Sequence, residues 1–168
     1  MNKTVFVTGG TYGTGFAIAE KFASEGCNVF VSGRDKEKVS SAATLLSEKY
    51  GIYAKGYQTA EFSQAEVISI FEAIKKDGYS VDTIVLNAAN LGIGQNSLEV
   101  DIDEFMSVYN INVKWNFMMA REAAKMMKEK HKGQIVFITS NSALRVTENR
   151  CAYCSSKSAI LAMSKSFA

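Results

Sequence analysis

The sequence predicts an α/β fold in which a doubly wound parallel sheet carries helices on both faces. Short apolar runs alternate with amphipathic stretches along the chain, and this order is typical of parallel strands joined by right-handed helical crossovers. The first apolar run also leads into a glycine-rich turn and then a helix, the context of a phosphate-binding loop. A chain of 168 residues is the size of one domain, so residues 1–168 are expected to form a single unit.

Apolar spacing and breaker residues define each element in order. A β-branched run predicts the first strand at residues 3–7, and apolar residues at helical spacing predict a helix at 14–25 that ends at Gly26. Ser63 followed by Glu66 forms a capping box that begins a later helix. The same criteria give strands at 28–32, 52–58, 81–86 and 134–139, and helices at 35–50, 63–76, 101–130 and from 152 to the end. The stretch 101–130 is expected to consist of two helices that meet near Asn110.

The composition excludes several classes of function. The 19 basic and 17 acidic residues nearly cancel, without the concentrated basic face of a nucleic-acid-binding protein. No apolar run approaches the roughly 18 residues needed to cross a bilayer, and the N-terminus does not resemble a signal peptide. The odd number of cysteines, three, argues against a secreted disulfide framework, so a cytoplasmic protein is expected. A single histidine predicts no metal site.

The turn after the first strand has the features of a phosphate cradle. It reads Thr-Gly-Gly-Thr-Tyr-Gly-Thr-Gly over residues 8–15 and is followed at once by a helix. Glycine permits positive φ and a close approach of the backbone to a ligand, and the N-terminus of the helix presents free N–H groups to an anion. A pyrophosphate is therefore expected to contact Gly9, Thr11, Tyr12, Gly13, Thr14 and Gly15.

Three residues in the last third of the chain could perform proton transfer. Tyr153 and Lys157 are four residues apart on a predicted helix, so their side chains lie on one face. A neighbouring ammonium favours the phenolate form of a tyrosine, which could then exchange a proton with a substrate oxygen. Ser140 lies 13 residues before Tyr153, at the end of the 134–139 strand, on the edge where such sheets bind ligands.

Together these motifs resemble those of the short-chain dehydrogenase/reductase family. The loop pattern T-G-x-x-x-G-x-G, the pair Y-x-x-x-K and the upstream serine occur in the family's order. The resemblance implies a Rossmann fold that binds a nicotinamide dinucleotide. It also implies that Ser140 hydrogen-bonds the substrate carbonyl, that Tyr153 exchanges the proton, and that Lys157 binds the nicotinamide ribose. Asn112, in Ile-Asn-Val, resembles the family asparagine that holds a proton-relay water.

The end of the second strand bears on the choice of dinucleotide. An acidic residue there binds the ribose hydroxyls of NAD, but this chain has Gly33 at that position, followed by Arg34. Arg34 could clamp a 2′-phosphate and Ser32 could add a hydroxyl, so NADP(H) is expected to be preferred, with NAD(H) as the alternative. Asp35 instead suits the N-cap of the next helix.

The resemblance adds further cofactor-binding positions. Glu61 stands where the family usually has Asp near the adenine, and Asn87-Ala88-Ala89 stands where it usually has Asn-Ala-Gly. Glu61, Asn87 and Ala88 are therefore expected to line the cofactor site. Two residues depart from the family pattern: Glu61 has a longer side chain than Asp, and Ala89 adds a methyl group where the family usually has Gly.

The function implied is hydride transfer between NADP(H) and a carbonyl or secondary alcohol, with 3-oxoacyl-carrier-protein reductase as the first activity to test. Family members continue with further strands and a substrate lid, so the chain is expected to be truncated at its C-terminus, with the C-terminal strands missing and the 134–139 strand as an uncovered edge. A truncated, non-catalytic dinucleotide-binding or interaction module is the alternative. The resemblance also implies a homo-dimer or homo-tetramer, built through the long helix and the helix of Tyr153.

Overall fold

The computed structural model describes residues 2–168, which contain a five-stranded parallel sheet in the order β3-β2-β1-β4-β5. The strands are β1 Thr4–Thr8, β2 Asn28–Gly33, β3 Ala54–Gln58, β4 Thr83–Leu86 and β5 Gln134–Phe137. Chain order runs outward from β1 to β3 and then restarts at β4 on the other side of β1. Ligands of doubly wound sheets bind at such a reversal, beyond the carboxyl ends of the strands.

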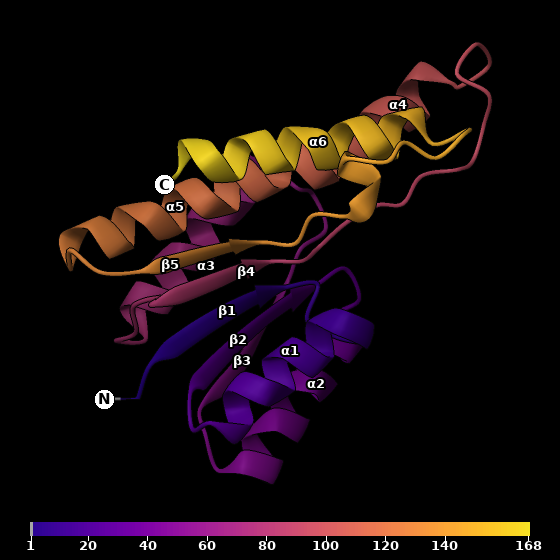
Figure 1. Ribbon diagram of the computed structural model, residues 1–168. Helices are drawn as coiled ribbons and strands as arrows, with labels where there is room; N and C mark the ends of the chain where they lie inside the picture. Colours follow the sequence, from indigo (N-terminus) through magenta and orange to yellow (C-terminus); the bar gives the residue numbers. More distant parts are fainter. Residues whose placement is uncertain (1) are drawn as a thin grey trace.

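Helices cover both faces of the sheet (Figure 1). They are α1 Gly13–Ser24, α2 Lys36–Tyr50, α3 Gln64–Lys76, α4 Ile102–Tyr109, α5 Asn116–Glu129 and α6 Cys151–Ser166. Helices α1 and α2 lie on one face, and α3, α5 and α6 lie on the other. A π-helical segment, Asn110–Trp115, joins α4 to α5, and a 3-10 turn, Asn141–Ala143, follows β5. No helix within residues 2–168 has both the length and the apolar character that crossing a membrane requires.

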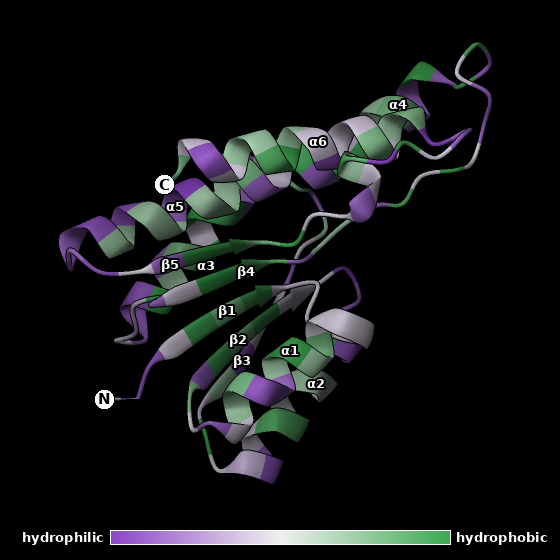
Figure 2. Ribbon diagram, in the orientation of Figure 1, coloured by the Kyte–Doolittle hydropathy of each residue, from purple (hydrophilic) through white to green (hydrophobic). Residues whose placement is uncertain are grey.

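The alternation of side chains along the strands divides the core into two layers. Val5 and Val7 of β1 point toward α1 and α2, whereas Phe6 between them packs toward α3 and α5, because successive strand residues face opposite sides. The rings of Tyr57 and Phe71 stack on Phe6, with centroids 6.0 and 6.1 Å away. Figure 2 shows hydrophobic stretches in the middle of β1 and β2 and along most of β4, as expected for strands buried on both faces.

The fold class and the helix starts agree with the sequence prediction. Asp35 caps α2 by accepting hydrogen bonds from the amides of Glu37 and Lys38 at 3.0 and 3.1 Å. Ser63 caps α3 by accepting the amide of Glu66 at 3.1 Å. The predicted helix over 101–130 is interrupted at Asn110, as expected, but the junction is π-helical.

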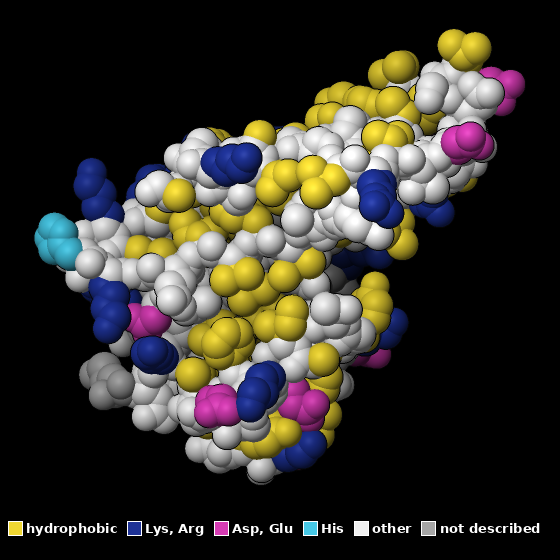
Figure 3. Space-filling model, in the orientation of Figure 1, with side chains coloured by type: hydrophobic (Ala, Val, Ile, Leu, Met, Phe, Trp, Pro, Cys, Tyr) yellow, Lys and Arg dark blue, Asp and Glu magenta, His cyan; other side chains and the backbone are white. Residues whose placement is uncertain are grey.

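The predicted strand over 134–139 is wrong in length, because β5 ends at Phe137. The amide of Ile138 still donates to the carbonyl of Leu86 at 3.1 Å, after which the chain turns into the 3-10 segment. Within the described residues β5 is an edge strand, as the sequence predicts, and the side chain of Val136 is 41% exposed. Hydrophobic side chains reach the surface between α1 and α6 (Figure 3).

Candidate active site

The candidate site lies where β1, β4 and β5 end at the same edge of the sheet. Parallel pairing aligns Val7 with Val85 and Leu86 with Phe137, so the loops that follow these three strands emerge side by side. The N-termini of α1 and α6 begin beside the same edge (Figure 1). The glycine loop, the Asn87 segment, Ser140 and the Tyr153–Lys157 pair therefore come from four different parts of the sequence to one rim.

The glycine loop has the backbone that a phosphate cradle needs. Gly9 and Gly13 adopt φ of 64° and 55°, a region that side chains disfavour. A Cβ on Gly15 would overlap the carbonyl oxygen of Gly9 and lie 2.5 Å from Nδ2 of Asn87. Tyr12 provides no side-chain cap for α1 and the first turn contains no acidic residue, so no side chain of this turn would compete with an anion for the amides at this helix end.

A hydrogen-bonded clip holds the loop in place. The hydroxyl of Thr8 accepts hydrogen bonds from the amides of Asn87 and Ala88 at 2.9 and 3.0 Å. The side-chain Nδ2 of Asn87 donates back to the carbonyls of Thr8 and Gly9 at 3.1 and 3.2 Å. Asn87 was expected to line the cofactor site, and its amide group here fixes the shape of the cradle.

A cationic side chain, that of Arg34, follows the end of β2. Arg34 is exposed and forms no ion pair with any of residues 2–168. A Cβ on Gly33 would lie 2.8 Å from Cγ2 of Thr11, which leaves little room for an acidic side chain at that position. Ser32 is 1% exposed, and its carbonyl accepts the amide of Gly10 at 3.1 Å, so its observed role is to anchor the loop through the backbone.

Glu61 lies on the exposed loop after β3. The carboxylate of Glu66 accepts three amides of this loop, those of Ala60, Glu61 and Phe62, at 2.7, 3.3 and 2.9 Å. Among residues 2–168, the side chain of Glu61 itself accepts one long hydrogen bond, 3.4 Å, from the hydroxyl of Ser63. Glu66 thus holds this loop, and the carboxylate of Glu61 stays exposed.

Tyr153 and Lys157 lie together on α6. The Nζ atom of Lys157 is 5.8 Å from the centroid of the Tyr153 ring and donates to the carbonyl of Ile138 at 2.8 Å. The lysine is only 2% exposed, and burial lowers its pKa. An ammonium carries three N–H donors, and within the described residues only one of them has an acceptor. This side chain can therefore donate to a ligand at the rim.

Ser140 begins the 3-10 turn beside this pair. Its hydroxyl accepts the amide of Ser142 at 3.1 Å and donates to Oδ1 of Asn141 at 3.3 Å. The hydroxyl of Thr139 donates to the carbonyl of Lys157 at 3.1 Å. These contacts hold the end of β5 against α6, and rotation of the Ser140 hydroxyl would redirect its proton to a ligand.

Asn112 is fully buried in the π-helical segment. Its Oδ1 accepts the amide of Asn90 at 2.7 Å, and its Nδ2 donates to the carbonyl of Asn90 and to Oγ of Ser156, each at 2.9 Å. Both N–H groups of the amide are therefore used, and any water held by Asn112 must bind an oxygen lone pair. Ser156, the partner of Asn112, was not predicted from the sequence, where its only distinguishing feature is its place between Tyr153 and Lys157.

The family model and the most similar curated proteins all describe dehydrogenases or reductases. The family model for short chain dehydrogenases matches residues 3–168. The chain is 33% identical to 3alpha-hydroxysteroid dehydrogenase of Mediterraneibacter gnavus, over 99% of this chain and 67% of that protein. It is 32% identical to 3-oxoacyl-(acyl-carrier-protein) reductase of Rickettsia bellii, over 99% of this chain and 65% of that protein.

Solved structures resemble the fold closely. An NAD⁺-bound xylitol dehydrogenase superposes with a TM-score of 0.93 at 27% identity, over 98% of this chain and 63% of that one. L-sorbose reductase from Gluconobacter frateurii, complexed with NADPH and L-sorbose, gives a TM-score of 0.92 at 25% identity, over 98% of this chain and 62% of that one. The chain thus spans about two thirds of the length of the proteins it matches.

Proposed function

The chain belongs to the short chain dehydrogenase family, and on this basis we propose that it forms the cofactor and catalytic site of an oxidoreductase that transfers hydride between NADP(H) and a carbonyl or secondary alcohol. One observation carries the proposal. The buried ammonium of Lys157 lies against the Tyr153 ring at the rim of the sheet, with two N–H donors that have no acceptor in the described residues.

The residues at the rim fit a dinucleotide. The glycine loop has open space at Gly13, where a Cβ would meet nothing within 4 Å, and a pyrophosphate would lie there against the N-terminus of α1. The unpaired donors of Lys157 suit ribose hydroxyls, and Arg34 suits a 2′-phosphate. The exposed carboxylate of Glu61 is available to the adenine end. These assignments make Gly9, Thr11, Tyr12, Gly13, Thr14 and Gly15 the pyrophosphate contacts.

The chain's own residues would then handle the substrate oxygen and its proton. A bound nicotinamide supplies or accepts the hydride. The hydroxyls of Ser140 and Tyr153 donate hydrogen bonds to the carbonyl oxygen of the substrate and so polarise it. As the oxygen becomes an alkoxide, Tyr153 transfers its proton to it, and Lys157 stabilises the resulting phenolate. A water on the Oδ1 lone pair of Asn112 that the Asn90 amide leaves free would resupply the proton. Oxidation of an alcohol runs the same steps in reverse.

The preference for NADP(H) rests on Arg34. Relatives of similar structure are described with NAD⁺ and with NADPH, so the choice lies with this chain's own residues. Arg34 is an exposed guanidinium without an ion pair in residues 2–168, and the position of Gly33 before it leaves little room for an acidic side chain. The carboxylate of Asp35, the residue after Arg34, is engaged in capping α2.

Arg34→Asp is therefore expected to weaken NADPH binding by about 10- to 100-fold, the strength of one charged hydrogen-bonded contact, and to spare NADH binding. Titration of each dinucleotide by fluorescence measures both constants. Lys36→Asp is the matched control, because it removes a neighbouring exposed charge that is not assigned to the cofactor. Equal affinities for the two dinucleotides in the unmodified protein would contradict the preference.

A 3-oxoacyl-carrier-protein is the substrate to test first, because the Rickettsia reductase is among the most similar proteins, with a 3-oxosteroid as the second choice. These substrates follow from the family proposal and from the similarities above. A panel of carbonyl substrates, read by loss of NADPH absorbance, tests them directly.

The three cysteines are unpaired, which suits a reducing cytoplasm.

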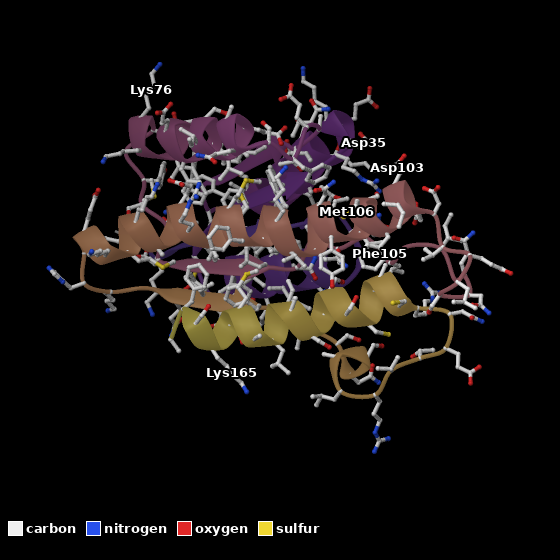
Figure 4. The ribbon with its side chains drawn as sticks, turned by 90° about the horizontal axis from the view of Figure 1, so that it is seen from above. Asp35, Lys76, Asp103, Phe105, Met106 and Lys165 are labelled. Carbon is white, nitrogen blue, oxygen red and sulfur yellow. The ribbon has the colours of Figure 1, made fainter. Side chains whose placement is uncertain are left out.

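We also expect a homo-dimer or homo-tetramer built through the layer of α4, α5 and α6. Figure 4 looks down on this layer and labels Met106 on α4. Ile102, Met106 and Phe117 are exposed there, and exposed apolar side chains gathered on one face mark interfaces. Light scattering should give at least twice the chain mass, and Met106→Asp should reduce it. A monomeric unmodified protein would contradict this assignment.

A further inference from the structure

Ser156 lies between the two residues of the proposed proton-transfer pair and is fully buried. Its hydroxyl donates to the carbonyl of Tyr153 at 2.7 Å, within its own helix. The same oxygen accepts a hydrogen bond from Nδ2 of Asn112 at 2.9 Å. One hydroxyl therefore joins the backbone of Tyr153 to a residue of another element.

The other end of this connection is equally well defined. The amide group of Asn112 hydrogen-bonds both the N–H and the carbonyl of Asn90, at 2.7 and 2.9 Å. Its remaining N–H points to Ser156. The loop after β4, the π-helical segment and α6 are thus linked in series through Asn90, Asn112 and Ser156. Each of these bonds involves the side chain of Asn112, which is fully buried. A buried polar group is costly to leave without a hydrogen-bond partner.

Neighbouring serines of α6 do not make this connection. The hydroxyl of Ser155 contacts only carbonyls of the preceding turn, those of Cys151 and Ala152, at 2.6 and 3.2 Å. The hydroxyl of Ser158 reaches the carbonyl of Ala143 at 2.9 Å, on the Ser140 side. Among the described serines of α6, Ser156 alone hydrogen-bonds the π-helical segment. Ser156 thus connects α6 to the π-helical segment, whereas Thr139 and Ile138 connect the same helix, through Lys157, to the end of β5.

We propose that Ser156 is a positioning residue that holds α6 against the π-helical segment and thereby sets the place of the Tyr153 hydroxyl relative to Ser140. The inference rests on the proposed function, which gives Tyr153 its role in proton transfer. Removing the hydroxyl leaves the second N–H of Asn112 buried without an acceptor, and α6 is then free to shift. A displacement of about 1 Å at a reacting group can cost about 10²-fold in rate.

The test compares Ser156→Ala with Ser155→Ala in the same helix. Alanine is smaller than serine and favours helix, so both variants are expected to fold. Ser156→Ala should lower kcat by about 10-fold or more, leaving KM and the Kd of NADPH unchanged, while Ser155→Ala behaves as the unmodified protein. A second readout uses ring-labelled tyrosine. The NMR signal of Tyr153, assigned by its loss in Tyr153→Phe, should move in Ser156→Ala alone.

The outcomes separate this inference from the proposed function. An unchanged kcat together with an unmoved Tyr153 signal in Ser156→Ala overturns the positioning role. A parallel fall of kcat, NADPH affinity and Tm also overturns it, because it indicates a general structural defect. If the unmodified protein turns over no carbonyl substrate but the Tyr153 signal still moves in Ser156→Ala alone, the positioning role holds and the proposed function fails.

Discussion

Replacing Tyr153 with phenylalanine is expected to lower kcat by about 10²- to 10⁴-fold, the usual contribution of a positioned proton donor. The proposed mechanism assigns the phenol of Tyr153 to the substrate oxygen, and the ammonium of Lys157 lies 5.8 Å from the centroid of the Tyr153 ring. Phenylalanine keeps the ring and its contact with Lys157, so the dinucleotide should bind as before. Steady-state turnover and a fluorescence titration of NADPH measure the two effects separately.

The value of this variant is that it removes only an oxygen atom. A fall in kcat with unchanged NADPH affinity assigns the hydroxyl to the chemical step. Turnover retained within a few-fold would show that the proton comes from another group, and the roles given to Ser140 and Lys157 would then need to be reconsidered. Loss of NADPH binding in Tyr153→Phe would instead place the hydroxyl in the cofactor site.

Gly15→Ala is expected to abolish measurable dinucleotide binding and to lower the free energy of unfolding by about 1–3 kcal/mol, as overpacked sites do. The added Cβ would overlap the carbonyl oxygen of Gly9 and press on Nδ2 of Asn87. Because Asn87 Nδ2 holds the carbonyls of Thr8 and Gly9, the loop must open to admit the methyl group. Calorimetric titration with NADPH and thermal unfolding measure the two effects.

Gly26→Ala provides the matched control for this experiment. Gly26 has a positive φ of 77°, and a Cβ there would meet nothing within 4 Å. Alanine at this position is strained and destabilising without touching the loop, so NADPH should still bind. If Gly15→Ala bound NADPH as well as Gly26→Ala does, the glycine loop could not be the pyrophosphate site.

Features that depend on nearby residues could be predicted from the sequence. The glycine loop, the Asp35 cap and the Ser63 cap each follow from a few consecutive side chains, and the structure contains all three. The alternation of strands and helices likewise gave the fold class. The strand ends were less well predicted, because β5 stops where the Ser140 turn begins, and the apolar run continues past that point.

Features that depend on contacts between distant residues could not be predicted. The clip between Thr8 and Asn87 joins residues 79 apart, and the bond between Asn112 and Ser156 joins residues 44 apart. An asparagine or serine in a helix sequence is equally compatible with a solvent-exposed position. The π-helical geometry around Asn112 was also invisible, because its residues fit an ordinary helical pattern. The site residues named from the sequence do gather at one rim, but the groups that hold them in place emerged only from the fold.

The most direct test of the central proposal follows the hydride itself. The protein would be incubated with NADPH that carries deuterium at the transferable position and with a panel of 3-oxoacyl thioesters and 3-oxosteroids, and the products would be analysed by mass spectrometry. The expected product is an alcohol with deuterium on the former carbonyl carbon, and this product should be absent when Tyr153→Phe replaces the unmodified protein. A protein that binds NADPH yet gives no deuterated alcohol from any member of the panel would contradict it.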